Sequence, residues 1–214
     1  MRPFPVVLSA PSGVGKTTIA HRLMAARSDV GYSVSCTTRQ PRATETDGVD
    51  YTFLSDADFV ARESEGEFAE WAVVHGQRYG TLRSEVQRVL DAGRYVLMDI
   101  DVQGAAQFIQ SFPQSVLVFV LPPSVDALVE RLRARNTETD AELAERLRNA
   151  HAELQDVDRY HYVVVNDNLD VAVDKVSAII DAESSKRERV HSLDAQVSEL
   201  IARLEEQIAR YKKP

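Results

Sequence analysis

The chain has 214 residues, of which 44% are hydrophobic and 27% charged, which is enough to bury one substantial core. Its net charge of −8 argues against a nucleic-acid partner, because affinity for a phosphate backbone comes from clustered lysine and arginine. Cys36 is the only cysteine, so no disulfide can form within the chain. No apolar stretch has the length of a signal peptide or a membrane span. We therefore expect a cytoplasmic protein with no nucleic-acid or membrane partner, although a few well-placed cations could still bind a small anion.

Four apolar runs predict the core. The first, Phe4 to Ser9, is rich in valine and leads through a turn of small residues into a helical pattern from Lys16 to Ala26. The other three are Tyr95 to Ile100, Val116 to Leu121 and Tyr162 to Asn166. They lack polar alternation, which is typical of strands buried on both faces. Buried strands separated by helices predict an α/β fold with a parallel sheet.

Two segments interrupt this core. Roughly from Ser33 to Leu90 the sequence is polar, with strand-like pieces around Val34, at Tyr51 to Leu54 and at Trp71 to Val74. We interpret it as an inserted subdomain. From Ser124 to Glu153 the sequence is helical and rich in arginine, with an interruption at Asn136 to Asp140. The predicted organisation is a core of residues 1–32, 91–123 and 154–183, a subdomain of 33–90, a lid of 124–153 and a C-terminal helical tail of 184–214.

The turn after the first strand has the pattern of a phosphate-binding loop, except that alanine replaces the first glycine. The expected ATP-binding residues here are Ala10, Pro11, Ser12, Gly13, Val14, Gly15, Lys16, Thr17 and Thr18. Glycines let backbone N–H groups point at phosphate oxygens at the start of a helix. Lys16 would neutralise the β- and γ-phosphates, and the Thr17 hydroxyl would bind Mg²⁺. A glycine-rich turn that only connects strand and helix is the alternative, which the correct flanking elements disfavour.

The second apolar run carries Asp99 at its end. It resembles the second element of a nucleotide site, which is a buried strand with a carboxylate at its end. There a terminal carboxylate faces the magnesium ion directly or through water. A strand that ends in aspartate is common, so this signal is weak alone. A phosphate loop by itself indicates a nucleotide and no particular reaction.

Several further motifs occur in collinear order over roughly residues 5–183. They are Ser33 to Arg42, Asp47 to Tyr51, Phe68 to Trp71, Tyr79 to Thr81, Asp99 to Gly104 and Pro122 to Ser124. Together they closely resemble the signature of guanylate kinases. The resemblance implies the P-loop nucleoside monophosphate kinase fold, with an inserted GMP-binding subdomain and a helical lid. It also implies transfer of the γ-phosphoryl group of ATP to GMP or dGMP, giving ADP and the nucleoside diphosphate in purine metabolism, with Mg²⁺ as cofactor.

The resemblance assigns an acceptor site. The residues implied to bind GMP are Ser35, Arg39, Arg42, Tyr51, Glu70, Tyr79, Thr81 and Asp101. The arginines and tyrosines would hold the phosphate of GMP. The two N–H groups of a planar guanidinium can bond two phosphate oxygens at once, and the tyrosine hydroxyls would add further donors. Ser35, Glu70 and Thr81 would recognise guanine. An ionised Glu70 would accept hydrogen bonds from the ring N–H and the exocyclic amine of guanine, whereas adenine presents an acceptor at the same ring position. Asp101 would orient an arginine or contact the guanosine.

Local chemistry alone leaves other interpretations of these residues open. Arg39 and Arg42 could form a solvated charged face, and Glu70 could be an exposed strand residue. Tyr51 and Tyr79 could be core aromatics whose hydroxyls reach water.

The lid would supply Arg135 and Arg146, which correspond to the pair of arginines that close over the transferring group. Guanylate kinases usually have glycine where this chain has Asn136, and the neighbouring Arg131, Arg133 and Arg148 could be a solvated face. Asn166 matches a residue near the adenine of ATP, or it could simply end its strand. The catalytic set implied is Lys16, Arg39, Asp99, Arg135 and Arg146, with Thr17 and Asp99 at the metal.

The tail carries an apolar stripe close to heptad spacing. Its members are Leu193, Val197, Leu200, Leu204 and Tyr211. The stripe predicts either packing on the chain's own core or a contact between copies, and we lean toward a homo-oligomer.

Two rival functions remain. One is a non-catalytic guanylate-kinase-like module that binds phosphopeptides, which the intact phosphate loop disfavours. The other is a kinase of another small phosphate such as a ribose bisphosphate, which the guanine-reading set Ser35, Glu70 and Thr81 disfavours.

Overall fold

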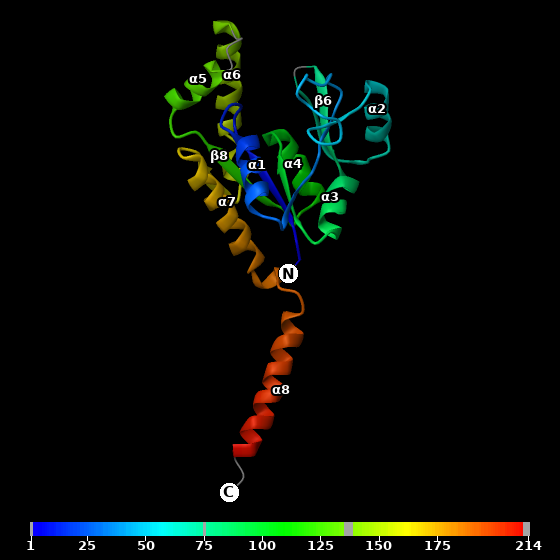
Figure 1. The fold of residues 1–214 in the computed structure, drawn as a ribbon, viewed down its shortest axis with the longest axis vertical. Helices are drawn as coiled ribbons and strands as arrows, with labels where there is room; N and C mark the ends of the chain where they lie inside the picture. Colours follow the sequence, from blue (N-terminus) through cyan, green and yellow to red (C-terminus); the bar gives the residue numbers. More distant parts are fainter. Residues whose placement is uncertain (1, 75, 135–138, 212–214) are drawn as a thin grey trace.

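A computed structural model describes residues 2–74, 76–134 and 139–211. The ribbon in Figure 1 has a central sheet with helices on both sides and a smaller sheet beside it. A pair of helices lies at the end of the molecule away from the N-terminus, and the C-terminal helix stands apart from everything else.

In the described part of the chain, five parallel strands form the core sheet. Their order is β2 (Val30–Tyr32), β7 (Tyr95–Asp99), β1 (Pro5–Ser9), β8 (Val116–Leu121) and β9 (Tyr162–Val165). Every residue of β1 is buried, as its valine-rich sequence predicts. Because parallel strands end at the same edge of a sheet, Ser9 and Asp99 come out on one side of the molecule.

The edge strand β2 was not predicted. The expected strand around Val34 is wrong, because Val34 lies in the connection between β2 and β3 (Cys36–Thr37). A strand of three residues with a glycine in its centre is too short to show a periodic pattern. Gly31 is needed there, because a Cβ atom at this position would lie 2.6 Å from Cγ1 of Val89.

Helices cover both faces of the core sheet. They are α1 (Lys16–Ala26) and α7 (Leu169–Ser184) on one face, and α3 (Arg83–Asp91) and α4 (Val102–Ser111) on the other. Alternation along β1 separates the two cores: Val6 and Leu8 pack in the first and Val7 in the second. The helix predicted from Lys16 to Ala26 matches α1 at both ends.

The second sheet lies wholly between residues 36 and 82. Its order is β4 (Thr52–Phe53), β3, β6 (Gln77–Leu82) and β5 (Phe68–Val74), with β6 antiparallel to both of its neighbours. Helix α2 (Asp56–Ser64) closes a small core in which Phe59 stacks on Phe68 at a centroid distance of 4.3 Å. The pairing of β5 with β6 shifts between Phe68 and Glu70.

Five further elements complete the described part of the chain. They are α5 (Val125–Arg133), α6 (Asp140–Leu154), the short 3₁₀ helices η1 (Val157–Arg159) and η2 (Arg187–Arg189), and α8 (Leu193–Tyr211). Helix α6 begins with a capping box in which Thr139 and Glu142 bond each other's backbone N–H groups. In α8 every residue after Leu193 is exposed. Across the described ranges, no helix combines the length and apolar character needed to cross a membrane.

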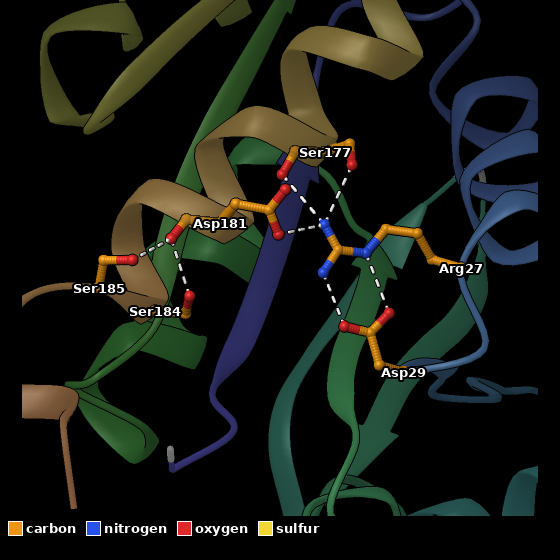
Figure 2. Close-up of polar contacts among 6 residues, drawn as sticks. All are labelled: Arg27, Asp29, Ser177, Asp181, Ser184 and Ser185. Atoms are coloured by element: carbon orange, nitrogen blue, oxygen red, sulfur yellow. Dashed lines mark hydrogen bonds and ion pairs between the residues drawn. The ribbon is translucent and has the colours of Figure 1, made fainter.

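Arg27 joins the end of α1 to α7, as Figure 2 shows. Its guanidinium forms a two-pronged pair with Asp29 at 3.0 and 2.7 Å and reaches Asp181 at 2.6 Å. It also donates to the backbone carbonyl and the hydroxyl of Ser177, at 3.2 and 3.0 Å. The Arg27 side chain is only 15% exposed, so these bonds are largely shielded from water.

We predict that Arg27→Met lowers the free energy of unfolding by about 1 to 2 kcal/mol, because several bonds to one guanidinium are lost while the stem remains. Arg22→Met is the control: Arg22 pairs with Asp170, but both side chains are mostly exposed, so the loss should stay within about 0.5 kcal/mol. Urea denaturation of both variants checks this. Equal losses would mean that the Arg27 contacts contribute nothing beyond surface pairing.

Candidate active site

The phosphate loop takes a conformation that only glycine adopts readily. Gly13 has φ +85° and Gly15 has φ +101°, directly before the first residue of α1. A Cβ atom on Gly13 would lie 2.8 Å from Cδ2 of Leu132, and one on Gly15 would lie 2.8 Å from Nδ2 of Asn166. The loop therefore needs glycine both for its backbone and for the neighbours packed on it. With the start of α1, the turn provides backbone N–H groups of the kind that can donate to phosphate.

Lys16, the first residue of α1, turns its side chain back to the loop. Its ammonium donates to the Ala10 carbonyl oxygen at 2.8 Å. Burial lowers the pKa of Lys16, and the nearby carboxylates of Asp99, Glu153 and Asp101 oppose this effect. The Lys16 ammonium is a donor that the loop can offer to an anionic ligand.

Asp99 is held at the carboxyl end of β7 by two hydroxyl groups. Thr17 Oγ1 donates to its Oδ2 at 2.5 Å, and the Tyr32 hydroxyl donates to its Oδ1. Burial, followed by the charge of Asp99, raises the pKa of Tyr32, so this phenol remains a donor. Tyr32 was not predicted, because it comes from the unpredicted strand β2.

The oxygens of Thr17 and Asp99 fit Mg²⁺, which prefers hard oxygen ligands. Within the ranges that the structure describes, no group of three or more histidine, cysteine, aspartate or glutamate side chains forms a metal cage. A magnesium ion here would therefore take its other ligands from phosphate and water, as it usually does.

Helices α5 and α6 and the end of β9 contact the loop. Asn166 Nδ2 donates to the Val14 carbonyl at 2.7 Å. Arg131 donates to the same carbonyl at 3.2 Å and to the Asn166 carbonyl at 2.9 Å, and Arg146 donates to Ser12 Oγ at 2.7 Å.

The interpretation of Arg131 as part of a solvated face is therefore wrong, whereas Arg133 and Arg148 are exposed. Arg135 and Asn136 lie outside the described residues.

On the opposite side, Arg39 is paired with a carboxylate that the sequence did not single out. Its two terminal nitrogens bond both oxygens of Glu45 at 2.9 Å, and its guanidinium lies 5.4 Å from the Tyr51 ring centroid. The Arg42 N–H also donates to Glu45, at 2.8 Å. The bond from Arg39, then that from the Arg42 N–H, lower the pKa of Glu45 to about 2. Tyr79 completes the group, with its ring 6.0 Å from that of Tyr51.

Ser35, Thr81 and Glu70 form a chain of polar contacts beside this group. Thr81 Oγ1 donates to Glu70 Oε1 at 2.6 Å, and the Ser35 and Thr81 hydroxyl oxygens are 3.4 Å apart. Glu70 is only 6% exposed, so the alternative of an exposed strand residue is wrong. Burial raises the pKa of Glu70 to about 7. The ionisation of Glu70 therefore falls in the neutral pH range, and its ionised form, which the resemblance implies on GMP, stays a prediction.

Asp101 lies between the two groups of residues. Its Oδ1 accepts the Gly104 N–H at 2.7 Å and so caps the first turn of α4. A Cβ atom on Gly104 would lie 3.3 Å from Asp101 Oδ1 and 2.7 Å from Glu70 Oε2, so Asp101 lies beside Glu70. Asp101 also follows by two residues Asp99, which accepts from Thr17 at the start of α1. This short segment connects the phosphate loop with the Glu70 group.

A sequence profile described as guanylate kinase matches residues 2–183. The chain is 51% identical to the guanylate kinase of Anaeromyxobacter dehalogenans over 180 residues, which cover 83% of this chain and 80% of that one. The chain belongs to the guanylate kinase family. It is also 42% identical to the guanylate kinase of Caldanaerobacter subterraneus over 194 residues, covering 91% of this chain and 94% of the relative.

A crystal structure of the guanylate kinase from Anaplasma phagocytophilum has the same fold. The TM-score is 0.73 at 34% identity, and the match covers 90% of this chain and 92% of that one. The fold is therefore the α/β P-loop kinase fold of the guanylate kinase family, as the motifs predicted. The family match ends at residue 183, before α8.

Proposed function

We propose that the chain transfers the γ-phosphoryl group of ATP to GMP, giving ADP and GDP, and accepts dGMP in the same site. The observation that carries this proposal is that the segment from Asp99 to Asp101 touches both groups: Asp99 accepts from Thr17 of the phosphate loop, and Asp101 lies beside Gly104 and buried Glu70. A nucleotide donor on the loop and a base at Glu70 would then face each other across one site. This function belongs to purine nucleotide metabolism.

On the donor side, the glycine turn and Lys16 would bind the β- and γ-phosphates of ATP. Thr17 and Asp99 would hold Mg²⁺, which would supply positive charge to neutralise the phosphate oxygens. Arg146, already on Ser12, and Arg135 would close over the transferring group and stabilise its spreading charge. Asn166 and the remaining loop residues would fix the loop that receives the nucleotide.

On the acceptor side, Arg39, Arg42, Tyr51 and Tyr79 would hold the phosphate of GMP. Arg39 uses both terminal nitrogens on the Glu45 carboxylate, which is the same two-pronged geometry that it would use on a phosphate. No covalent intermediate is required, because in-line transfer depends on positioning and on charge stabilisation.

Guanine would be selected by the buried chain of Ser35, Thr81 and Glu70. Ionised Glu70 accepts two hydrogen bonds from guanine, whereas adenine offers an acceptor at the matching ring position. A buried carboxylate left without these donors is unfavourable, so AMP would be rejected.

A coupled assay with ATP and a panel of GMP, dGMP, AMP, CMP and UMP tests this function, with ribose 1,5-bisphosphate as a further acceptor. We expect turnover with GMP and dGMP and none with the others. ATP binding without turnover on any acceptor would favour the phosphopeptide-binding module, and turnover on the sugar phosphate alone would favour the other kinase class. Either result contradicts the proposal.

We predict that the KM for GMP rises as the pH falls from 8 to 6. The pKa of Glu70 is raised to about 7, so below that pH the carboxyl binds a proton and loses the charged form that accepts from guanine. The KM for ATP should change little over this range. Steady-state kinetics in a buffer series of constant ionic strength measures both constants.

Glu70→Gln is the matched variant. The amide cannot accept both donors as a carboxylate does, so the KM for GMP should increase by roughly 30- to 150-fold, corresponding to about 2 to 3 kcal/mol. The GMP phosphate itself titrates near pH ~6, and this contribution persists in the variant. If the variant keeps the full pH dependence of the wild type, Glu70 does not read guanine.

The site accounts for ATP and GMP as partners. A net charge of −8 disfavours nucleic acid as a third partner, and we place the protein in the cytoplasm, where both nucleotides occur, without association with membranes.

The remaining partner is a second copy of the chain, bound through α8. The large apolar side chains of this helix are exposed: Val197, Leu200, Ile201, Leu204, Ile208 and Tyr211. The alternative of packing on the chain's own core does not occur for these residues, since each is more than 40% exposed. They follow heptad-like spacing, so burial against the same helix of another copy would remove one continuous stripe from water.

Deleting residues 192–214 should convert a dimer or larger assembly into a monomer and leave GMP phosphorylation intact, because every residue placed in the site precedes the tail. Multi-angle light scattering of the full and shortened chains measures this, with Leu200→Glu/Leu204→Glu as a variant of full length. A full chain that is already monomeric at tens of micromolar would exclude self-association through α8.

A further inference from the structure

Tyr32 is the last residue of the edge strand β2 and lies beside the site. It is in register with Leu97 of the parallel strand β7, two residues before Asp99. Side chains two residues apart on a strand share one face, so Leu97 and Asp99 point to the same side of the sheet. Tyr32 and Leu97 both pack in the core that α1 covers. The sheet therefore places the Tyr32 ring on the same face as the Asp99 carboxylate.

The Tyr32 hydroxyl reaches this carboxylate from below along the strand direction. At about 3.3 Å per residue, Asp99 lies about 6.6 Å further along β7 than the register partner of Tyr32. The hydroxyl, at the far end of the ring, covers this distance and donates to Asp99 Oδ1. Thr17, in the first turn of α1, donates to the other oxygen, Oδ2, at 2.5 Å. A carboxylate turns easily about its last bond, and a donor on each oxygen opposes this rotation.

The rest of Tyr32 is held without its hydroxyl. The ring packs on the core and meets the His21 ring edge to face at a centroid distance of 6.3 Å. The backbone of β2 pairs with β7 along all three of its residues, and the Ser33 N–H donates to the Leu97 carbonyl at 3.2 Å. Since ring and backbone are fixed in this way, the hydroxyl acts on the carboxylate more than on the fold.

We propose that Tyr32 is a positioning residue for magnesium: by holding Asp99 Oδ1, it keeps Oδ2 beside the Thr17 hydroxyl, where these two oxygens would hold the ion. This inference rests on the proposed function. Tyr32 acts through Asp99 and needs no contact with the ion. Partners of this kind fix the orientation of a ligand and so help to set the affinity of a metal site.

Tyr32→Phe tests this proposal, because it removes the hydroxyl and keeps the ring. The Mg²⁺ concentration that gives half-maximal turnover should rise about tenfold, since losing the partner of a metal ligand weakens metal binding by roughly 10- to 100-fold. The KM for GMP should stay within about twofold.

Tyr162→Phe is the matched control. Tyr162 is the first residue of β9, the opposite edge strand, and its hydroxyl also donates to a carboxylate, Glu183 Oε1, at 2.5 Å. The same atom is removed from the same kind of bond, at the end of the sheet away from the site. The magnesium dependence of this variant should match that of the wild type.

Calorimetric titration with ATP in the absence of GMP gives a readout that needs no turnover. With Mg²⁺ present, the dissociation constant of Tyr32→Phe should rise about tenfold, and with EDTA in place of Mg²⁺ it should stay within about twofold of the wild type. If the wild type binds ATP with Mg²⁺ but phosphorylates no GMP, the proposed function fails, while the role of Tyr32 can still be measured by binding.

A double-mutant cycle with Asp99→Ala tests whether Tyr32 acts through Asp99. Each single change should weaken binding of ATP with Mg²⁺, whereas adding Tyr32→Phe to Asp99→Ala should change the dissociation constant by less than about twofold. A further tenfold loss in the double variant would contradict the proposal, because Tyr32 would then act by another route.

Two other results would overturn the role of Tyr32. One is binding of ATP with Mg²⁺ in Tyr32→Phe equal to that in Tyr162→Phe. The other is an equal loss with Mg²⁺ and with EDTA together with a lower melting temperature, which indicates a structural role. If Tyr32→Phe does not fold, Tyr32→Leu carries the test, and an unchanged magnesium dependence in that variant likewise overturns the proposal.

Discussion

The left-handed turns at Gly13 and Gly15 are the constraint on which the rest of this molecule depends. They direct backbone N–H groups into the loop, and they leave no room for a Cβ atom because Leu132 and Asn166 fill that space. Leu132 belongs to α5, and Asn166 follows the last core strand. The phosphate loop is therefore packed against the helical segment and the sheet edge at once. A change in any of the three would alter the geometry offered to a nucleotide.

An acidic chain of net charge −8 can offer a site for polyanions because its charges are distributed unevenly. Lys16 donates to the Ala10 carbonyl, and Arg39 is paired with Glu45. In both places an oxygen of the protein already holds the cation in position. This arrangement keeps the cations ordered, and an incoming phosphate would compete with that oxygen as well as with water.

The sequence predicted the parts of this structure that are local. The bounds of α1 and β8 agree with the apolar patterns, and the phosphate loop was evident from eight consecutive residues. The features that it missed depend on contacts between residues far apart in the sequence. The Tyr32 hydroxyl bonds Asp99, 67 residues away, and Arg131 bonds the Val14 carbonyl, 117 residues away. No periodic pattern records such pairs. The raised pKa of Glu70 was also beyond reach, since it follows from burial beside Thr81 of β6 and Gly104 of α4 and not from any neighbour in sequence.

The isolated position of α8 affects how the size of this protein should be measured. The helix extends about 28 Å at 1.5 Å per residue, and Figure 1 shows it pointing away from the globular part. A particle of this shape has more friction with solvent than a sphere of the same mass. A single chain would therefore diffuse slowly for its 23.9 kDa and leave a gel-filtration column early, as a larger globular protein does. Hydrodynamic radius alone thus exaggerates the mass of this chain, and a method that reads mass independently of shape is required.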